Sequence, residues 1–438
     1  MPRPCWTVSW RGMGFRGTDE NEFMTGQSKP GWWRWGVCGL LLLASTINYM
    51  DRQTLANASV RITKEFQLTQ EQYGDLELAF GWAFAGGSLL FGVLADRMPV
   101  RWLYPMALLC WSVMGYLTGS VYTYEGLLWC RGLLGLFEAA HWPCALKTTQ
   151  HLLESKDRTL GNSVLQSGTS IGAIITPLIM RAMLTEELGS WRPAFQWIAA
   201  TGVLWIVLWF AAIRASDLPD HSRAAVASTG SGSFWHLLLD RRFAAVLVLV
   251  AMINTSWQTL RAWLPKFLME GRGYAEKAAL DFNALYYVAT DVGCLAAGAL
   301  TLALGRRGFG VHRARSITFL MAASLTALAL FLPFLGKGPV LLMVLLAIGA
   351  GALGLFPCYY AWTQELSRVH QGKVSGLTGV AAWALSAPAQ KGFGWLIDET
   401  KSFDLGLVVA GLLPLVGFGL FTLLWKEPNA RLEPAKAV

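Results

Sequence analysis

Long apolar segments constrain the fold of this chain more than any other feature. A helix that crosses a bilayer core of about 30 Å needs about 20 mainly apolar residues. Only 15% of the 438 residues are charged, whereas soluble domains carry about 25%, and 54% are hydrophobic. We therefore predict an all-α integral membrane protein with twelve transmembrane helices. The predicted spans are residues 33–53, 76–95, 102–121, 125–147, 160–183, 194–213, 243–267, 280–303, 315–335, 339–363, 374–397 and 404–425.

The longest internal polar stretch, Arg214 to Arg242, follows the sixth span and contains a run of small residues at 227–233, which is typical of a linker. The sequence after the second span, Gly92 to Arg97, is echoed after the eighth at 298–307. Two related six-helix halves are a transporter architecture. The predicted parts are an N-terminal tail (1–31), an N-terminal six-helix bundle (32–214), a linker (215–242), a C-terminal six-helix bundle (243–426) and a C-terminal tail (427–438).

Lysine and arginine are more frequent in alternate loops and in both tails than in the remaining loops. Since cytoplasmic loops of membrane proteins are enriched in these residues, we expect both termini to be cytoplasmic. We expect a multi-pass protein of the cell inner (plasma) membrane, a monomer with the lipid bilayer as its surroundings. Residues 1–28 are too weakly apolar for a signal peptide, and either Met1 or Met24 is the start.

The net charge of +8 does not indicate nucleic-acid binding, because the basic residues lie in short loops and form no continuous stripe. The seven cysteines have no metal-ligand or redox spacing. The sequence also contains no nucleotide-binding glycine loop and no nucleophile motif. We therefore expect no enzyme, no cofactor and no metal site.

The fourth span carries two charges in an otherwise apolar stretch, Trp129 to Pro143. In a helix, Arg131 and Glu138 lie on nearly the same face, about 10 Å apart along the axis. A single charge at a bilayer centre costs about 2.5–3.5 kcal/mol. Two charges on one face favour a cavity between helices, and a structural ion-pair network is the alternative.

The first span holds a second pair of charges, Asp51 and Arg52. One interpretation is that they mark the outer membrane surface. The next charge comes only at Arg61, after residues that prolong the helix. This spacing favours a position inside the span.

Other polar residues within the spans leave two interpretations open. Arg261 lies between tryptophans and either faces a cavity or reaches the outer interface, where tryptophan is common. Gln166 and Trp383 line a polar cavity or serve packing. His141 follows Glu138 by three residues and either relays protons or is a buried core histidine, which we favour.

The loop after the second span is predicted to act as a conformational gate. Its carboxylate, Asp96, can pair with a neighbouring helix end in one state of a moving bundle and release it in another. The gate residues are Gly92, Asp96, Arg97 and Arg101.

Three motifs resemble a known family. The pattern Gly92-x-Leu94-Ala95-Asp96-Arg97-x-x-x-Arg101 is similar to the signature between helices 2 and 3 of the major facilitator superfamily. Two further motifs resemble the anion:cation symporter branch of this superfamily, which includes bacterial hexuronate and aldonate (sugar acid) transporters. They are Asn48-Tyr49-x-Asp51-Arg52-Gln53 and Arg131-x-Leu133-Leu134-Gly135-x-x-Glu138-Ala139-x-x-x-Pro143.

The resemblance implies proton-coupled symport of an organic anion, expected to be a hexuronate or an aldonate, by alternating access. In such transporters, the arginine that corresponds to Arg52 binds the substrate carboxylate. The resemblance also implies that Asp51 and Glu138 take up protons and that Arg131 pairs with those two carboxylates or with the substrate. It implies that Tyr49 faces the cavity.

General physical chemistry gives the same outline. A substrate carboxylate that competes for Arg52 or Arg131 deprives Asp51 or Glu138 of its partner, so that this carboxylate binds a proton more readily. Anion and proton then favour each other's binding. The main alternative is an exchanger or exporter of phosphorylated or other carboxylated metabolites, which could use Arg52 and Arg261 together on a phosphate. A non-transporting membrane sensor is a further alternative.

Overall fold

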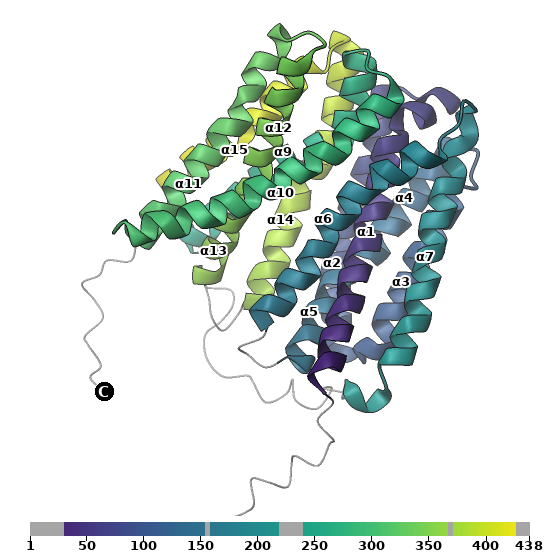
Figure 1. Cartoon of the computed structure of the whole chain (residues 1–438), viewed down its shortest axis with the longest axis vertical. Helices are drawn as coiled ribbons and strands as arrows, with labels where there is room; N and C mark the ends of the chain where they lie inside the picture. Colours follow the sequence, from purple (N-terminus) through teal and green to yellow (C-terminus); the bar gives the residue numbers. More distant parts are fainter. Residues whose placement is uncertain (1–29, 154–157, 219–239, 367–370, 426–438) are drawn as a thin grey trace, which may run out of the picture.

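The computed structural model describes residues 30–153, 158–218, 240–366 and 371–425, and within these ranges it contains helices and no strand (Figure 1). Each predicted span has a helical counterpart, so the prediction of an all-α protein with twelve spans is confirmed. The first six spans are α1 (Gly31–Glu65), α2 (Gln70–Arg97), α3 (Val100–Thr118), α4 (Tyr124–Glu138) with α5 (His141–Leu152), α6 (Arg158–Met183) and α7 (Trp191–Ala212). The last six are α9 (Arg241–Lys266) with the π-helical turn η4 (Phe267–Gly271), α10 (Glu276–Arg306), α11 (Val311–Thr326) with the 3₁₀ segment η5 (Ala327–Phe334), α12 (Pro339–Gly354) with α13 (Phe356–Leu366), α14 (Gln371–Thr400) and α15 (Asp404–Leu424).

Two spans are interrupted near their middle. The fourth breaks between α4 and α5, and the tenth breaks between α12 and α13. A proline follows each break, Pro143 in the first turn of α5 and Pro357 in the first turn of α13. Proline is tolerated there because the first amide groups of a helix lack intrahelical partners. The first break leaves Glu138 as the last residue of α4.

Seven helical segments in the described ranges are long and apolar enough to cross a membrane by length and composition alone. The helices outside that set include α1 and α14, which carry many polar side chains, and α4, which has only 15 residues before the break. In α1, for example, Asp51 and Arg52 are buried rather than exposed to the surroundings. The buried charges of α1 and α4 face the interior of the bundle, where the surrounding helices supply polar groups.

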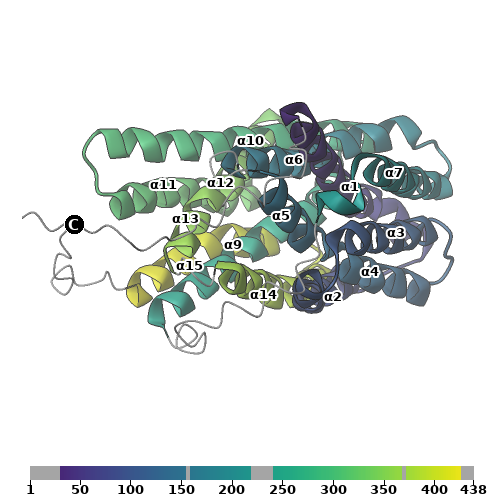
Figure 2. The ribbon, with the colours of Figure 1, turned by 90° about the horizontal axis from the view of Figure 1, so that it is seen from below.

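Two groups of helices lie side by side, α1–α7 and α9–α15 (Figure 2). They meet along three helix pairs, α2 with α14, α6 with α10, and α1 with α9. The two-bundle division with boundaries at 214 and 243 stays a prediction, because most of the linker, 219–239, and the tails 1–29 and 426–438 lie outside the described residues.

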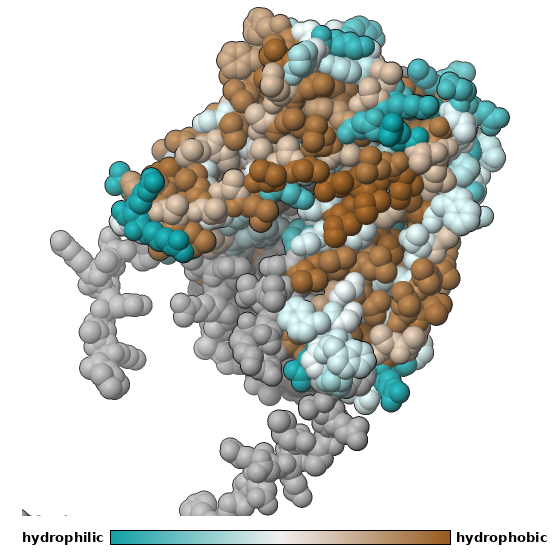
Figure 3. Space-filling model, viewed as in Figure 1, coloured by the Kyte–Doolittle hydropathy of each residue, from teal (hydrophilic) through white to brown (hydrophobic). Residues whose placement is uncertain are grey.

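Apolar side chains cover the outward faces of the helices. Figure 3 shows them over the middle of one face, with hydrophilic residues gathered toward the ends. On α7, for example, Leu204 and Val207 are 59% and 61% exposed. Such a broad apolar surface is typical of contact with lipid.

The first and last described helix ends lie at the same end of the molecule. There Trp33 at the start of α1 donates a hydrogen bond to the Ala212 carbonyl at the end of α7, at 3.0 Å. Likewise Arg241 at the start of α9 donates to the Leu423 carbonyl near the end of α15, at 3.0 Å. We call the opposite end, where α1 ends and α2 and α10 begin, the distal end.

Candidate functional site

The centre of the site lies on α1. Asp51 and Arg52 are only 2% and 5% exposed, well inside a helix of 35 residues, so they do not mark a membrane surface. Arg52 Nε donates a hydrogen bond of 2.7 Å to Oε2 of Glu138, which is fully buried. This ion pair joins α1 to the end of α4.

Aromatic rings surround the guanidinium of Arg52. Its carbon Cζ lies 5.5 Å from the ring centroid of Tyr49, 5.3 Å from that of Phe80 and 4.7 Å from that of Phe84. The rings of Phe84 and Trp383 are 5.4 Å apart, which brings α14 of the second helix group to the same place. Arginine is stabilised over aromatic faces, so these rings hold the cation in a position buried from water.

Arg131 lies beside this pair and is fully buried. Its Cζ is 4.6 Å from the Phe80 ring centroid, and Nη2 is 3.8 Å from Oε1 of Glu77 on α2. None of the described residues accepts a hydrogen bond from Nε, Nη1 or Nη2 of Arg131. A buried guanidinium with unused donors is a strong attractor for an anion.

Arg261 faces the interior of the protein and not the membrane interface, which decides between the two interpretations of the sequence. It is 2% exposed, and its Nη2 donates to Oε2 of Glu77. Its Nε donates to Gln258 at 2.6 Å, and Nη1 lies 3.4 Å from the main-chain carbonyl oxygen of Arg52. An arginine of the second helix group therefore reaches the site of the first.

Glu77 is a central residue that sequence reasoning missed. The predicted span began at residue 76, which placed Glu77 at the membrane surface, whereas α2 begins at Gln70 and Glu77 is fully buried. The signal that would have found it is the capping box at Thr69 and Gln72, which marks the true start of the helix two turns earlier.

The carboxyl group of Asp51 lies against α3, near the charges of Arg52, Arg131 and Glu138. A Cβ added to Gly115 of α3 would lie 3.3 Å from Oδ1 of Asp51. No hydrogen-bond partner for Oδ2 is found among the described residues. The carboxyl group is thus buried near the arginines without a direct partner.

Among the described residues, three buried acidic and three buried basic side chains lie in this region. The members are Asp51, Arg52, Glu77, Arg131, Glu138 and Arg261, each 5% exposed or less. Removing charges from water is costly unless they are paired, and an unpaired buried charge is strongly unfavourable. Buried ionisable groups inside a membrane bundle are therefore more typical of a ligand or ion pathway than of a stabilising device.

A polar seam between the helix groups continues from this cluster toward the distal end. Gln53 on α1 donates to the Tyr287 hydroxyl on α10, and Asn283 on α10 donates to Oδ1 of Asn57 at 2.8 Å. Gln53 and Asn57 are four residues apart and share one face of α1. Gln53 ends the first-span motif, whereas Asn57, Asn283 and Tyr287 were not identified from the sequence.

His141 occupies a closed position in the core, in agreement with the interpretation that we favoured. It is fully buried, with Nε2 3.0 Å from the Ser45 hydroxyl and Nδ1 2.7 Å from the Tyr104 hydroxyl. Both ring nitrogens are thus engaged by hydroxyl groups of α1 and α3, away from Glu138.

Gln166 is not part of the cluster. Its side chain is exposed, and its amide lies 3.4 Å from the Thr169 hydroxyl on the same helix, α6. Its role in substrate binding stays a prediction.

The predicted gate residues lie where α2 ends and α3 begins. Gly92 is in the last turns of α2, Arg97 is its last residue and is exposed, and the side chain of Asp96 lies outside the described residues. Arg101 Nε donates to the Ile213 carbonyl at 3.1 Å, which ties the start of α3 to the end of α7. Lys147 of α5 donates to the Ala95 carbonyl and adds a second tie at this turn.

The distal end closes through polar contacts between the helix groups. The carboxylate of Asp398 on α14 accepts hydrogen bonds from the main-chain amides of Gln70 and Glu71, at 3.1 and 2.8 Å, at the start of α2. Lys391 on α14 pairs with Asp75 at 3.0 Å and with Glu71 at 3.3 Å. A carboxylate is favoured at a helix N-terminus, so these contacts hold α2 against α14.

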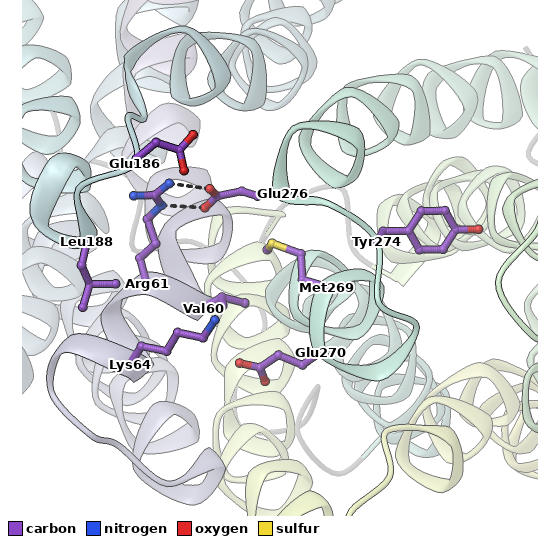
Figure 4. Close-up of a pocket in the computed structure, with 9 residues that line it drawn as sticks. All are labelled: Val60, Arg61, Lys64, Glu186, Leu188, Met269, Glu270, Tyr274 and Glu276. Carbon is purple, nitrogen blue, oxygen red and sulfur yellow. Dashed lines mark hydrogen bonds and ion pairs between the residues drawn. The ribbon is translucent and has the colours of Figure 1, made fainter.

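A pocket of about 310 Å³ lies in this distal end, apart from the buried charges (Figure 4). Arg61 of α1 forms a two-bond ion pair with Glu276 of α10 there, at 2.8 and 2.6 Å. Lys64 and Glu186 also line it, so its wall carries both signs of charge. The pocket belongs to the closed contact between the helix groups and is distinct from the site around Arg131.

Known proteins match the chain over most of its length. Residues 41–391 match the family model of the Major Facilitator Superfamily. The "Hexuronate transporter" of Escherichia coli (strain K12) is 26% identical over 90% of this chain and 95% of its own length. The "Probable galactarate/D-glucarate transporter GarP" of the same strain is 23% identical over 87% and 92%.

Solved structures share the fold. A bacterial homologue of the human lysosomal transporter Spinster, in an inward-facing and unoccupied conformation, superposes with a TM-score of 0.73 over 91% of this chain and 97% of its own, at 18% identity. The twelve spans, the buried intramembrane charges and the family match over residues 41–391 lead to one conclusion. The chain belongs to the Major Facilitator Superfamily and is a multi-pass membrane transporter, not an enzyme.

Proposed function

We propose that this protein is a proton-coupled symporter that imports a sugar acid, a hexuronate or an aldonate, by alternating access. In this proposal it lies in the cell inner membrane with both termini cytoplasmic, so the distal end faces outward. The relatives named as hexuronate and galactarate/D-glucarate transporters support a sugar acid as the substrate.

The observation that carries the proposal is the set of unused donors on Arg131. This guanidinium is fully buried, and no described residue accepts its hydrogen bonds. Arg52 Nη2 likewise has no partner among the described residues, although Nε of the same side chain binds Glu138. A carboxylate placed between Arg131 and Arg52 would satisfy both groups with charge-assisted hydrogen bonds.

Proton coupling follows from competition for Arg52. Its ion pair with Glu138 is short, 2.7 Å, and buried, so each partner depends strongly on the other. A substrate carboxylate that draws Arg52 away leaves the Glu138 carboxylate without its cation. Proton binding then removes the unpaired charge, and Asp51 provides a second carboxylate nearby. Substrate and proton consequently bind with mutual preference.

Alternating access requires contacts between the helix groups that can open. The ion pairs and caps of the distal end, Arg61–Glu276, Lys391–Asp75 and Asp398 at the start of α2, are partly exposed and polar. Contacts of this kind are individually weak and exchange readily with water. They suit a closure that forms in one state of the transport cycle and breaks in the other.

The test is transport by purified protein in liposomes, with D-galacturonate and D-galactonate as substrates. Glu138→Gln should abolish accumulation driven by a pH gradient, because glutamine takes up no proton. It should retain counterflow, because glutamine still accepts a hydrogen bond from Arg52. Arg52→Ala should lose substrate binding, and Glu125→Gln, a change at an exposed residue of α4, is the matched control.

Full gradient-driven uptake by Glu138→Gln would rule out its proton role, and unchanged substrate affinity in Arg52→Ala would rule out its substrate role. Binding of hexose phosphates in place of sugar acids by the unmodified protein would instead support the exchanger of phosphorylated metabolites.

A further inference from the structure

Glu77 and the two arginines on either side of it lie between the helix groups. One carboxylate oxygen, Oε2, accepts a hydrogen bond from Arg261 Nη2, and the other, Oε1, is 3.8 Å from Arg131 Nη2. All three side chains are at most 2% exposed. Glu77 thus occupies the position between two cations that a bound carboxylate would otherwise take.

The three arginines of the site differ in what their donors contact. Arg52 is paired with Glu138, and Arg261 is paired with Glu77 and also donates to Gln258. Arg131 alone of these three has no hydrogen-bond acceptor among the described residues. The protein's own carboxylates therefore leave one guanidinium open to a ligand.

A ligand with a second carboxylate would need a second cation. To reach Arg261, it would have to displace Glu77, which would leave a buried carboxylate without its partner. It would also bring its second negative charge close to Glu77 itself. Both effects oppose a dianion and leave a monoanion unaffected, because the monoanion needs only the open donors of Arg131 and Arg52.

We propose that Glu77 is a specificity-determining residue that restricts the substrate to monocarboxylates by occupying the cation of Arg261. This rests on the proposed function and deepens it, because it selects hexuronates and aldonates over aldarates of the same carbon skeleton. Glu77 acts as an internal anion, and its removal opens a second carboxylate site at Arg261.

The test compares ligands that differ in one carboxylate. D-galactonate, D-galacturonate and galactarate share a six-carbon skeleton, and only galactarate is a dianion. Dissociation constants are measured by calorimetry on purified protein, together with counterflow in liposomes. The unmodified protein should bind the two monoanions at least about tenfold more tightly than galactarate, a difference of about 1.4 kcal/mol.

Glu77→Gln should shift this preference toward galactarate by about tenfold or more, since glutamine keeps the shape and the hydrogen-bond acceptor but removes the competing charge. Glu77→Asp, which keeps the charge, should retain the preference for monoanions. The double variant Glu77→Gln with Arg261→Gln should lose the gain for galactarate, because the second cation is gone. Glu125→Gln is again the control.

Each outcome decides the proposal. If the unmodified protein binds galactarate as tightly as the monoanions or more tightly, the proposal is overturned without any variant. It is also overturned if a folded Glu77→Gln protein keeps the same preference for monoanions over galactarate. If both proteins bind the monoanions and Glu77→Gln does not change the preference over galactarate, only the role of Glu77 is overturned and the proposed function stands. Galactarate binding that appears only in Glu77→Gln, with neither monoanion bound by either protein, supports the role of Glu77 while contradicting import of sugar monoacids. No anion binding by either protein overturns both.

Discussion

At the scale of single residues, the buried charges and the buried histidine have different surroundings. Arg131 has unused hydrogen-bond donors, and Arg52 and Glu138 depend on one another. His141 has both ring nitrogens engaged by the hydroxyls of Ser45 and Tyr104. Glu138 and His141 are only three residues apart, but they lie on either side of the break between α4 and α5 and contact different neighbours. Proximity in sequence therefore does not imply a shared role.

The structural role of His141 gives a prediction at this scale. His141→Ala should lower the free energy of unfolding by about 1–3 kcal/mol, because it opens a cavity and removes the contacts of His141 with two buried hydroxyls. Ser45 keeps its hydrogen bond to the Leu41 carbonyl, whereas the Tyr104 hydroxyl loses its contact with the imidazole. Gradient-driven uptake per folded molecule should remain. Thermal unfolding in detergent and uptake in liposomes measure the two effects.

Ser45→Ala is the matched control, since it removes one of the two hydrogen bonds, with an expected cost of about 0.6 kcal/mol in a membrane protein. Loss of proton-driven uptake in a His141→Ala protein of unchanged stability would contradict the structural role and favour a proton relay.

At the scale of helices, close approach depends on glycine in two different settings. Within the first group, a Cβ on Gly168 of α6 would overlap the Leu42 carbonyl of α1, and one on Gly172 would overlap the Thr46 carbonyl. Between the groups, a Cβ on Gly394 of α14 would overlap the Gln70 carbonyl at the start of α2. Small residues allow helix backbones to approach in membranes.

These settings predict different effects of one added methyl group. Gly168→Ala should lower stability by about 1–3 kcal/mol, since α1 and α6 belong to one helix group, which moves as a unit in the proposed transport cycle. Gly394→Ala should instead disfavour the closed distal end, because the added methyl group prevents the close approach of α14 to the start of α2. Thermal unfolding measures the first effect, and labelling of a cysteine at Met269, which lines the distal pocket, by an impermeant maleimide measures the second.

The labelling uses a background in which the native cysteines are replaced. Equal losses of stability in the two variants, with no change in labelling, would show that the α2–α14 contact belongs to the permanent core.

At the scale of the whole molecule, the two helix groups are held together at the distal end by polar contacts that span both. The pair Arg61–Glu276 is the best defined, with two hydrogen bonds and side chains that are 13% and 25% exposed. Partly exposed pairs contribute about 0.2–1 kcal/mol each, so several such pairs can hold one state without locking it.

Charge reversal at this pair tests whether it holds the distal end closed. Glu276→Arg should place two arginines face to face and increase labelling of the Met269→Cys probe by about two- to fivefold, in line with the loss of a partly exposed pair. Arg61→Glu should act in the same direction. The double reversal should bring labelling back toward that of the unmodified protein.

An increase in the double variant equal to the sum of the single effects would mean that the two residues act independently. Lys277→Glu, on the turn of α10 next to Glu276, is the control for a change of local charge alone.

The sequence by itself determined the class of fold, the number of spans and most of the charged residues of the site. This is possible because a bilayer demands long apolar helices, and because each charge within them is conspicuous. Asp51, Arg52, Arg131 and Glu138 were all identified in this way, and the structure brings them together.

Only the tertiary structure decided which charges pair. Arg131 and Glu138 share one helix face, yet Glu138 pairs with Arg52 and Arg131 lies beside Glu77. Glu77 escaped prediction because helix ends are the least certain part of a span read from sequence. The pairing of Arg261 with Glu77 joins residues 184 positions apart. Side-chain periodicity fixes which residues share a face of one helix, whereas the partner across an interface depends on how the helices pack.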